Sequence, residues 1–239
     1  MRAANRKFDE LRKVEIIPDV NSYAEGSCLI KCGNTHVICT ASVENKVPQW
    51  LKDGGKGWIT AEYALLPRAT HTRVNRETHG TGGRTHEIQR LIGRSMRAVV
   101  NLEALEGYLI TLDCDVIQAD GGTRTAAITG SFVALTIALK KMVRDGLIPV
   151  LPIRESVAAV SVGICAGTKL LDLEYEEDSN AQVDANFVLT NHGRIVEVQG
   201  TAEGEPFSKE DYNALMELAQ KGINELIVLQ QEALKNAKL

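Results

Sequence analysis

The chain of 239 residues lacks long apolar runs, a Cys-x-x-Cys pair and a strong net charge, and each absence excludes a class of protein. No window approaches the roughly 18 to 20 apolar residues that cross a membrane, and the polar N-terminus leads into no apolar signal-peptide core. We therefore expect a cytoplasmic protein without membrane contact. The five cysteines lie in apolar, strand-like surroundings, so we expect buried, reduced thiols and not disulfides or zinc ligands.

Lysine is missing from residues 68–97, although this segment is strongly basic. Its seven arginines and two acids give it a net charge of +5, whereas the whole chain carries −4, which leaves −9 for the remainder. Arginine offers a planar donor fork suited to phosphate. This basic segment (residues 68–97) therefore predicts a localised surface for a polyanion, although a row of arginines on a helix is also typical of a solvated face.

Apolar periodicity predicts the α/β (α+β) class, with mixed sheets and packed helices. The predicted strands are residues 24–30, 36–43, 58–66, 109–117, 157–166, 170–175, 186–189 and 194–199, and the predicted helices are 84–100, 126–142 and a C-terminal helix from Ser208. Residues 68–83 show no periodicity and are expected to form a long loop. Two β-hairpin-then-helix units, roughly 1–148 and 149–239, indicate a duplicated β-α arrangement in a single domain of residues 1–239. No linker divides the halves, so we expect them to share one sheet system.

Residues 118–125 (Gln-Ala-Asp-Gly-Gly-Thr-Arg-Thr) join a predicted strand to a predicted helix through a Gly-Gly turn. The first backbone N–H groups of a helix have no internal partner, and the helix macrodipole favours negative charge there. A turn followed by Thr123, Arg124 and Thr125 therefore indicates an anion-binding cradle. The alternative is a tight turn in which Thr123 or Thr125 merely caps the helix.

A cluster of acids follows the strand predicted at residues 170–175. Its members are Glu174, Glu176, Glu177, Asp178 and Asp184. Such a patch is most often a solubilising loop. Asp178 and Asp184 each adjoin a strand end and have small neighbours, which favours a compact pair of carboxylates. Two close carboxylates can hold Mg²⁺ or share a proton, and phosphoryl transfer needs a cationic cradle together with a metal.

Several long runs, in order and over nearly the whole chain, resemble the bacterial ribonuclease PH family. These runs are residues 57–63, 66–70, 83–85, 87–92, 113–116, 118–125, 177–179 and 197–204. The resemblance implies a phosphate-dependent 3′-to-5′ exoribonuclease, or tRNA nucleotidyltransferase, that trims tRNA precursors and other structured RNA with single-stranded 3′ ends. Inorganic phosphate is then the co-substrate, nucleoside 5′-diphosphates are released, and the reverse reaction adds nucleotides. The family fold is a duplicated β-α arrangement, and its subunits form a homohexameric ring, a trimer of dimers.

The resemblance also implies roles for single residues. The residues implied to hold the attacking phosphate are Arg84, Gly122, Thr123 and Arg124. Asp178 and Asp184 match an acidic pair taken to bind a divalent metal such as Mg²⁺, and Asp184 is also implied in proton transfer. The candidate RNA contacts are Arg68, Arg73 and Arg76, which match the family's basic loop, together with Arg90 and Arg97 of the predicted helix.

Two departures from the family pattern concern loops. Asn5 stands where glycine commonly precedes the arginine that is Arg6 here, and we expect the turn to survive because asparagine tolerates the left-handed conformation. The loop between Arg76 and Gly83 is shorter than usual. A non-catalytic RNA-binding ring subunit is the alternative function, but such subunits typically lose the phosphate arginines or the acidic pair, and both are present. A small-molecule kinase is a second alternative, and the chain has no Walker-type motif.

Overall fold

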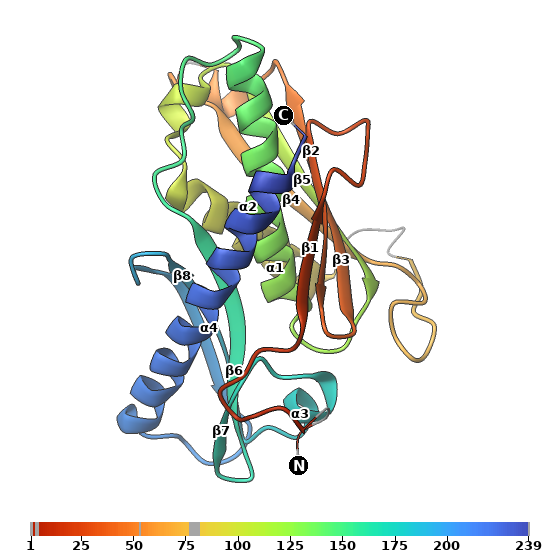
Figure 1. The fold of residues 1–239 in the computed structure, drawn as a ribbon, viewed down its shortest axis with the longest axis vertical. Helices are drawn as coiled ribbons and strands as arrows, with labels where there is room; N and C mark the ends of the chain where they lie inside the picture. Colours follow the sequence, from red (N-terminus) through yellow and green to blue (C-terminus); the bar gives the residue numbers. More distant parts are fainter. Residues whose placement is uncertain (1, 3–4, 53, 77–81, 239) are drawn as a thin grey trace.

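The computed structural model describes residues 2, 5–52, 54–76 and 82–238, and its strands form two sheets (Figure 1). The first sheet has the order β1-β2-β3-β5-β4 and contains β1 (Val14–Pro18), β2 (Gly26–Cys32), β3 (Thr35–Glu44), β4 (Trp58–Leu65) and β5 (Leu109–Gln118). The second has the order β7-β6-β8-β9 and contains β6 (Val157–Cys165), β7 (Thr168–Leu171), β8 (Val183–Thr190) and β9 (Ile195–Ala202). The α/β class with mixed sheets is confirmed. The expectation of one shared sheet system was wrong, because each hairpin pairs only within its own half.

The first sheet is antiparallel except for β4 and β5, which are parallel. Parallel neighbours require a crossover connection, and α1 (Gly83–Val99) lies in the connection between these strands and packs on β4. Alternate residues of β5 (Ile110, Leu112 and Cys114) are buried, as expected of a strand with one face toward the core. The helix predicted at residues 84–100 is confirmed, and its apolar residues form the buried face of α1.

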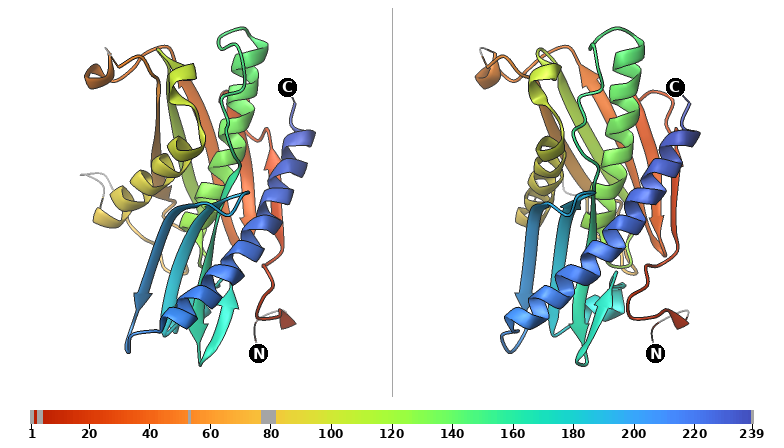
Figure 2. Two further views of the ribbon diagram at one scale, coloured as in Figure 1. Left: turned by 90° about the vertical axis from the view of Figure 1, so that its left-hand side faces the viewer. Right: turned by 60° about the vertical axis from the view of Figure 1, so that its left-hand side comes forward.

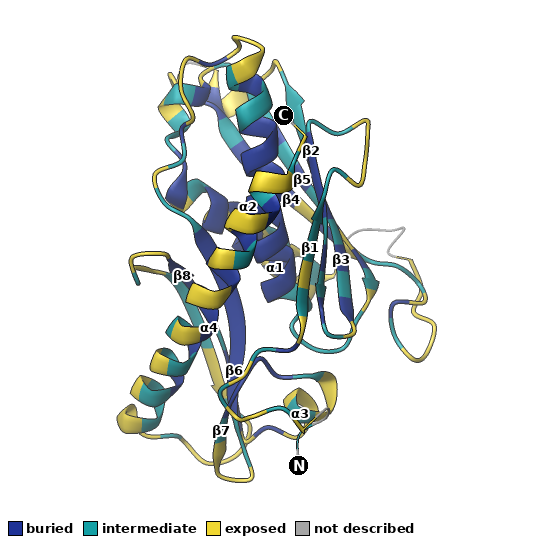
Figure 3. Ribbon diagram, in the orientation of Figure 1, coloured by how far each residue is buried: buried dark blue, intermediate teal, exposed yellow. Residues whose placement is uncertain are grey.

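The helix α2 (Thr123–Arg144) lies at the centre of the molecule, and every residue from Thr125 to Leu139 is buried (Figure 3). It packs against β2 and β3 of the first sheet and against β6 of the second. A helix that is apolar on all sides is expected inside a large core. By length and composition α2 could span a membrane, contrary to the expectation that no segment is apolar enough to do so. Most of the helix is buried within the fold.

The helix α4 (Lys209–Asn236) runs alongside both sheets and contacts β6 of the second sheet, β1 of the first and α2 (Figure 2). Its start at the predicted Ser208 has a capping box, in which the Ser208 hydroxyl accepts from the Asp211 amide at 3.0 Å and the Asp211 carboxylate accepts from the Ser208 amide at 3.2 Å. Leu215, Ala219 and Ile223 of α4 complete an apolar cluster with the second sheet. This long helix therefore ties the two halves together.

Two elements near the site were not predicted. The edge strand β1 is half-buried along most of its length and shows no clear alternation, and α3 (Tyr175–Ser179) is a single turn, too short for helical periodicity. The strand predicted at residues 170–175 ends at Leu171, as part of β7. All five cysteines are free thiols, and four are buried while Cys165 is half-buried.

Candidate active site

The glycine turn (residues 120–122) connects β5 to α2, and its backbone favours glycine at two positions. Gly121 and Gly122 both have left-handed backbone conformations, with φ of +73° and +66°. A Cβ atom at Gly121 would lie 2.7 Å from the carbonyl oxygen of Leu173 and 2.9 Å from the amide nitrogen of Tyr175. The turn therefore lies directly against the backbone at the start of α3.

The N-terminus of α2 has the property expected of an anion-binding cradle, because no side chain caps it among the described residues. Thr125 donates its hydroxyl to the carbonyl of Gly122 at 2.9 Å, and the hydroxyl of Thr123 lies 2.8 Å from that of Tyr63. Neither threonine accepts from a helical N–H, so the capping alternative does not describe this turn. The first N–H groups of a buried helix remain open to an anion.

Arg124 is held beside this cradle by two side chains from other elements. Its Nη1 donates to Oε1 of Gln199 in β9 at 2.7 Å and to Oε1 of Glu87 in α1 at 3.2 Å. Gln199 itself donates to Glu87 at 2.9 Å. A guanidinium has five N–H donors, and within the described part of the chain only Nη1 of Arg124 is engaged by side chains. The remaining donors can face an anion.

Arg84 lies in the first turn of α1, and its side chain is exposed. It forms no ion pair with any described residue, and it lines a cavity of about 510 Å³ together with Tyr63 and Arg76. The same cavity is bordered by Asp113, whose pKa is raised by burial and by the neighbouring carboxylates of Asp115 and Glu62. This cavity is therefore lined by both cationic and anionic side chains.

The two candidate metal ligands come from different elements. Asp178 lies in α3, and Asp184 lies near the start of β8, opposite Gly163 of β6 and Thr201 of β9. Burial and the charge of Asp184 raise the pKa of Asp178, while Arg84, Arg124 and Arg12 act in the opposite direction. The fold therefore brings together around Asp178 the carboxylate partner and both predicted phosphate arginines.

A metal at this pair would be held by two carboxylates. Within the described residues no group of three or more His, Cys, Asp or Glu side chains could hold a metal ion. Magnesium commonly binds through one or two carboxylates and completes its octahedron with water and substrate phosphate. The pair Asp178 and Asp184 suits that mode, and the metal role stays a prediction.

Three arginines of the basic segment lie in the loop before α1. Arg68 donates to the carbonyl of His71, and Arg73 donates to Asn75, both at 3.0 Å. These two and Arg76 are exposed and lie in a stretch without helix or strand. The predicted shortening of this loop concerns residues 77–81 among others, which lie outside the described residues.

Two arginines of α1, Arg94 and Arg97, have partners on other elements. Arg94 forms an ion pair with Glu197 of β9. Arg97 donates to the carbonyl of Ile59 at 2.8 Å, and its guanidinium lies 4.4 Å from the ring centroid of Trp58. Arg90 is exposed and forms no ion pair with the described residues. Arg97 is thus engaged in packing against β4, whereas Arg90 is free to contact a ligand.

Sequence reasoning missed several supporting residues of the site. The sequence analysis places Tyr63 and Gln199 in predicted strands and in runs that resemble the family, but assigns neither a role in the site. Arg12 and Asp172, which brace the glycine turn, are far apart in the sequence and leave no local pattern. The expectation for Asn5 is confirmed, because its φ is +55°.

Both halves of the chain match known families. Residues 10–141 match the 3′ exoribonuclease family, domain 1, and residues 155–222 match the 3′ exoribonuclease family, domain 2. A ribonuclease PH of Rhodospirillum rubrum is 56% identical over 240 residues and covers all of both chains. A ribonuclease PH of Methylobacterium radiotolerans is 59% identical over 237 residues, which cover 98% of this chain and all of the relative.

Solved structures show the same fold. The Archaeoglobus fulgidus exosome with RNA bound to the active site matches with a TM-score of 0.80 and 26% identity, over 95% of this chain and 91% of that one. Rice (Oryza sativa) Rrp46 matches with a TM-score of 0.79 over 98% of this chain and 100% of that one, and at 18% identity this likeness concerns the fold alone.

Proposed function

Since the chain belongs to the 3′ exoribonuclease family, we propose that it is a phosphorolytic 3′-to-5′ exoribonuclease of the ribonuclease PH type. Full-length relatives named ribonuclease PH, at 56% and 59% identity, support this activity. The observation that carries the proposal is the uncapped N-terminus of α2 beside Arg84, Arg124 and Asp178. An open anion site adjoining a carboxylate pair is what phosphate-dependent cleavage of RNA requires.

The reaction joins two anions, and the arrangement of charges offsets their repulsion. An oxygen of inorganic phosphate attacks the terminal phosphodiester phosphorus, the bond to the 3′ oxygen breaks, and that oxygen takes up a proton. The helix N–H groups and the guanidinium groups of Arg84 and Arg124 hold the attacking phosphate in line. Asp184 is proposed to exchange the proton with the 3′ oxygen. The products are a nucleoside 5′-diphosphate and an RNA shortened by one nucleotide.

The proposed cofactor is a divalent metal, Mg²⁺, held by Asp178 and Asp184. When bound, such an ion would stabilise the negative charge that develops on the phosphate oxygens. Burial and the neighbouring charge of Asp184 raise the pKa of Asp178, and a divalent cation held between the two carboxylates would offset their repulsion.

The proposed substrates are tRNA precursors and other structured RNA with single-stranded 3′ ends. The exposed guanidinium groups of Arg68, Arg73, Arg76 and Arg90 support contact with the phosphate backbone. Arg97 is a weaker candidate than the sequence predicts, since Ile59 and Trp58 engage its guanidinium. Recognition through the backbone suits an enzyme that tolerates sequence at the 3′ end.

We further propose a homohexameric ring and a cytoplasmic location. Large apolar side chains are exposed at several places, among them Tyr23 at 95% and Trp50 at 66%. Exposed apolar surface of this kind is typical of subunit contacts. Mass measurement in solution tests the assembly.

Product analysis tests the activity. We expect a tRNA with a 3′ extension to be shortened only when inorganic phosphate is present, with nucleoside diphosphates as products. Release of monophosphates by water alone would contradict phosphorolysis. Asp184→Asn should bind RNA and fail to turn over, whereas full activity of that variant would remove Asp184 from the catalytic set. A chain that binds RNA and never cleaves it would favour the alternative, a non-catalytic ring subunit.

A further inference from the structure

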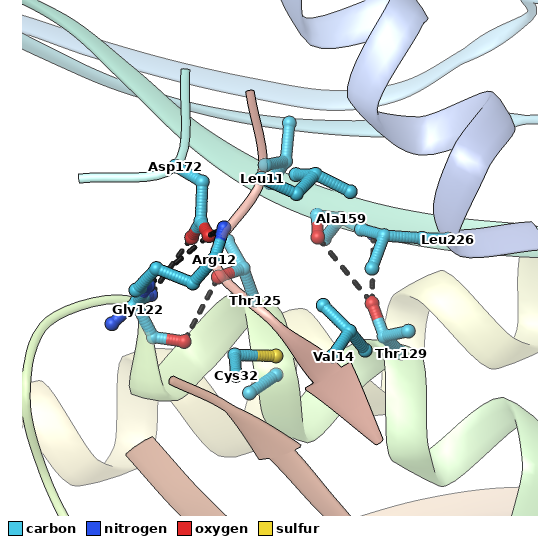
Figure 4. Close-up of a pocket in the computed structure, with 12 residues that line it drawn as sticks. Leu11, Arg12, Val14, Cys32, Gly122, Thr125, Thr129, Ala159, Asp172 and Leu226 are labelled. Carbon is cyan, nitrogen blue, oxygen red and sulfur yellow. Dashed lines mark hydrogen bonds and ion pairs between the residues drawn. The ribbon is translucent and has the colours of Figure 1, made fainter. Parts of the chain in front are cut away.

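A buried ion pair joins the N-terminal part of the chain to the segment that precedes α3. Arg12 and Asp172 are 7% and 5% exposed. Nη2 and Nε of Arg12 donate to the two carboxylate oxygens of Asp172 at 2.7 and 3.1 Å, and the backbone N–H of Arg12 donates to the same carboxylate at 2.8 Å. Figure 4 shows the Arg12 side chain between Asp172 and the start of α2.

The same guanidinium also holds the glycine turn. Nη1 of Arg12 donates to the carbonyl of Asp120 at 2.5 Å, and Nη2 donates to the carbonyl of Gly121 at 3.4 Å. Thr35 fixes the other side of the turn, since its hydroxyl donates to the carbonyl of Gly121 at 2.6 Å and accepts from the amide of Asp120 at 2.9 Å. Arg12 is therefore a bridge between the carbonyls of the turn and the carboxylate of Asp172.

The contacts continue from the turn to the helix that carries Asp178. Asp172 has a left-handed backbone, with φ of +56°, and lies two residues before Glu174, the N-cap of α3. The carboxylate of Asp120 accepts from the amide of Tyr175, the first residue of α3, at 3.3 Å. The cavity beside Arg12 is only about 10 Å³, enough for about one water molecule. The turn, the ion pair and α3 therefore form one closed unit.

A second set of ion pairs secures α3 from the same part of the chain. Arg2 and Arg6 pair with Glu177, the neighbour of Asp178, at 2.6 and 3.2 Å. Arg6 also donates to the carbonyl of Asp172 at 2.7 Å. The left-handed conformation of Asn5 lies directly before Arg6. Residues 2 and 5–12 therefore contact both the glycine turn and α3.

We propose that Arg12 and Asp172 are positioning residues, which fix the N-terminus of α2, and hence the bound phosphate, relative to α3 and Asp178. This inference rests on the proposed function and names residues that touch neither substrate nor metal. A buried ion pair is weak support for stability alone, because apolar residues of similar volume often serve as well. Its value here is orientation, since a displacement of about 1 Å at a reacting group can lower a rate about 100-fold.

Three variants separate positioning from stability. Arg12→Lys keeps the charge and loses the planar fork. Asp172→Asn keeps the shape and the tolerance of positive φ, but leaves the Arg12 guanidinium buried without a charged partner. Arg12→Met combined with Asp172→Asn removes both charges and should restore much of the stability that each single change loses. Asp9→Asn is the matched control, because it removes an exposed ion pair with Lys221 in the same N-terminal region.

The measurements are phosphate-dependent turnover on a 3′-extended tRNA, RNA binding, and the shift of melting temperature caused by inorganic phosphate. We expect the double variant to fold, to bind RNA like the wild type, and to show a KM for phosphate raised about 10- to 100-fold. The phosphate-induced melting shift should shrink in parallel, while Asp9→Asn behaves as the wild type. Arg12→Lys should also raise the KM for phosphate, and it should lose less stability than Asp172→Asn.

Wild-type phosphate kinetics in a stably folded double variant would overturn the proposal, as would an equal loss in Asp9→Asn. If every Arg12 and Asp172 variant failed to fold, including Arg12→Lys, the pair would be structural and the proposal wrong. Failure of the proposed function gives a different pattern. The wild type would then show no phosphate-dependent turnover. The phosphate-induced shift of melting temperature would still test whether the variants bind the anion more weakly than the wild type.

Discussion

The hydroxyl of Tyr63 lies 2.8 Å from Oγ1 of Thr123, which links β4 of the first sheet to the first residue of α2. Tyr63 is 4% exposed. Burial raises its pKa, although the hydrogen bond to Thr123 and the charges of Arg84 and Arg124 act in the opposite direction. The phenol is therefore protonated under ordinary conditions and fixes the threonine side chain at the cradle.

Tyr63→Phe should weaken the use of phosphate more than it weakens folding. The loss of one hydrogen bond of about 1 kcal/mol corresponds to roughly a fivefold change, so we expect the KM for phosphate to rise by about that factor. Steady-state assays over a range of phosphate concentrations measure it. Tyr108→Phe is a control at the opposite end of β5 from the glycine turn, and an equal effect there would argue against a specific role of Tyr63.

Gly121→Ala should abolish activity and destabilise the fold. The added Cβ would meet the carbonyl oxygen of Leu173 at 2.7 Å, and the backbone would be held at a φ of +73°. Gly146→Ala is a matched control, because Gly146 has nearly the same φ, +72°, and nothing within 4 Å of the added atom. The left-handed conformation alone costs about 1–2 kcal/mol. Urea unfolding of both variants should show a larger loss for Gly121→Ala, and equal losses would contradict the close packing against α3.

Two arginines of α1 should separate RNA binding from stability. Arg97→Ala removes the hydrogen bond to Ile59 and the contact with Trp58, so we expect about 2 kcal/mol less free energy of unfolding. Arg90→Ala should leave stability nearly unchanged and reduce the salt dependence of tRNA binding by about one charge. Binding isotherms at several salt concentrations and thermal melts distinguish the two. A loss of stability in Arg90→Ala together with a loss of salt-dependent RNA binding in Arg97→Ala would contradict both assignments.

The capping box of α4 gives a prediction for pH. Hydrogen bonds from Lys169 and Ser208 lower the pKa of Asp211 to about 2, from the ordinary 3.8. A carboxylate with a lowered folded pKa stabilises the fold above its unfolded pKa, and this contribution is lost as pH falls through the folded value. The difference in melting temperature between the wild type and Asp211→Asn should therefore be constant down to about pH 4 and shrink below it. A difference independent of pH would exclude this linkage, and Lys169→Met should make the decline smaller.

The sequence could predict the elements of the site better than their mutual contacts. Alternation in β5, the Gly-Gly pair and the apolar run of α2 are local signals, and all three lie where they were predicted. The sequence left an anion cradle and a capped turn as alternatives. The structure argues against the capped turn because Thr123 and Thr125 are engaged elsewhere, and phosphate binding at the turn stays a prediction. The resemblance to a known family supplied Arg84 and Asp184 in their proposed roles.

What escaped prediction depends on contacts between distant segments. The helix α3 is one turn long, and its single turn is stabilised by Glu177, which pairs with Arg2 and Arg6. The partner of Arg94 is Glu197 on a strand of the other half. No pattern within a window of a few residues encodes such pairs. For the same reason periodicity predicted the strands of both halves but not that they form two separate sheets.

Because α2 is enclosed by both sheets and by α4, its amide groups can exchange with solvent only when a large part of the protein opens. A phosphate seated on the first turn of that helix would bind the closed form alone, and would favour it in proportion to its concentration over its dissociation constant. Slowed hydrogen exchange should then reach amides of the deepest core, far from the anion. Phosphate binding at α2 and the free energy of global unfolding are therefore thermodynamically linked in this protein.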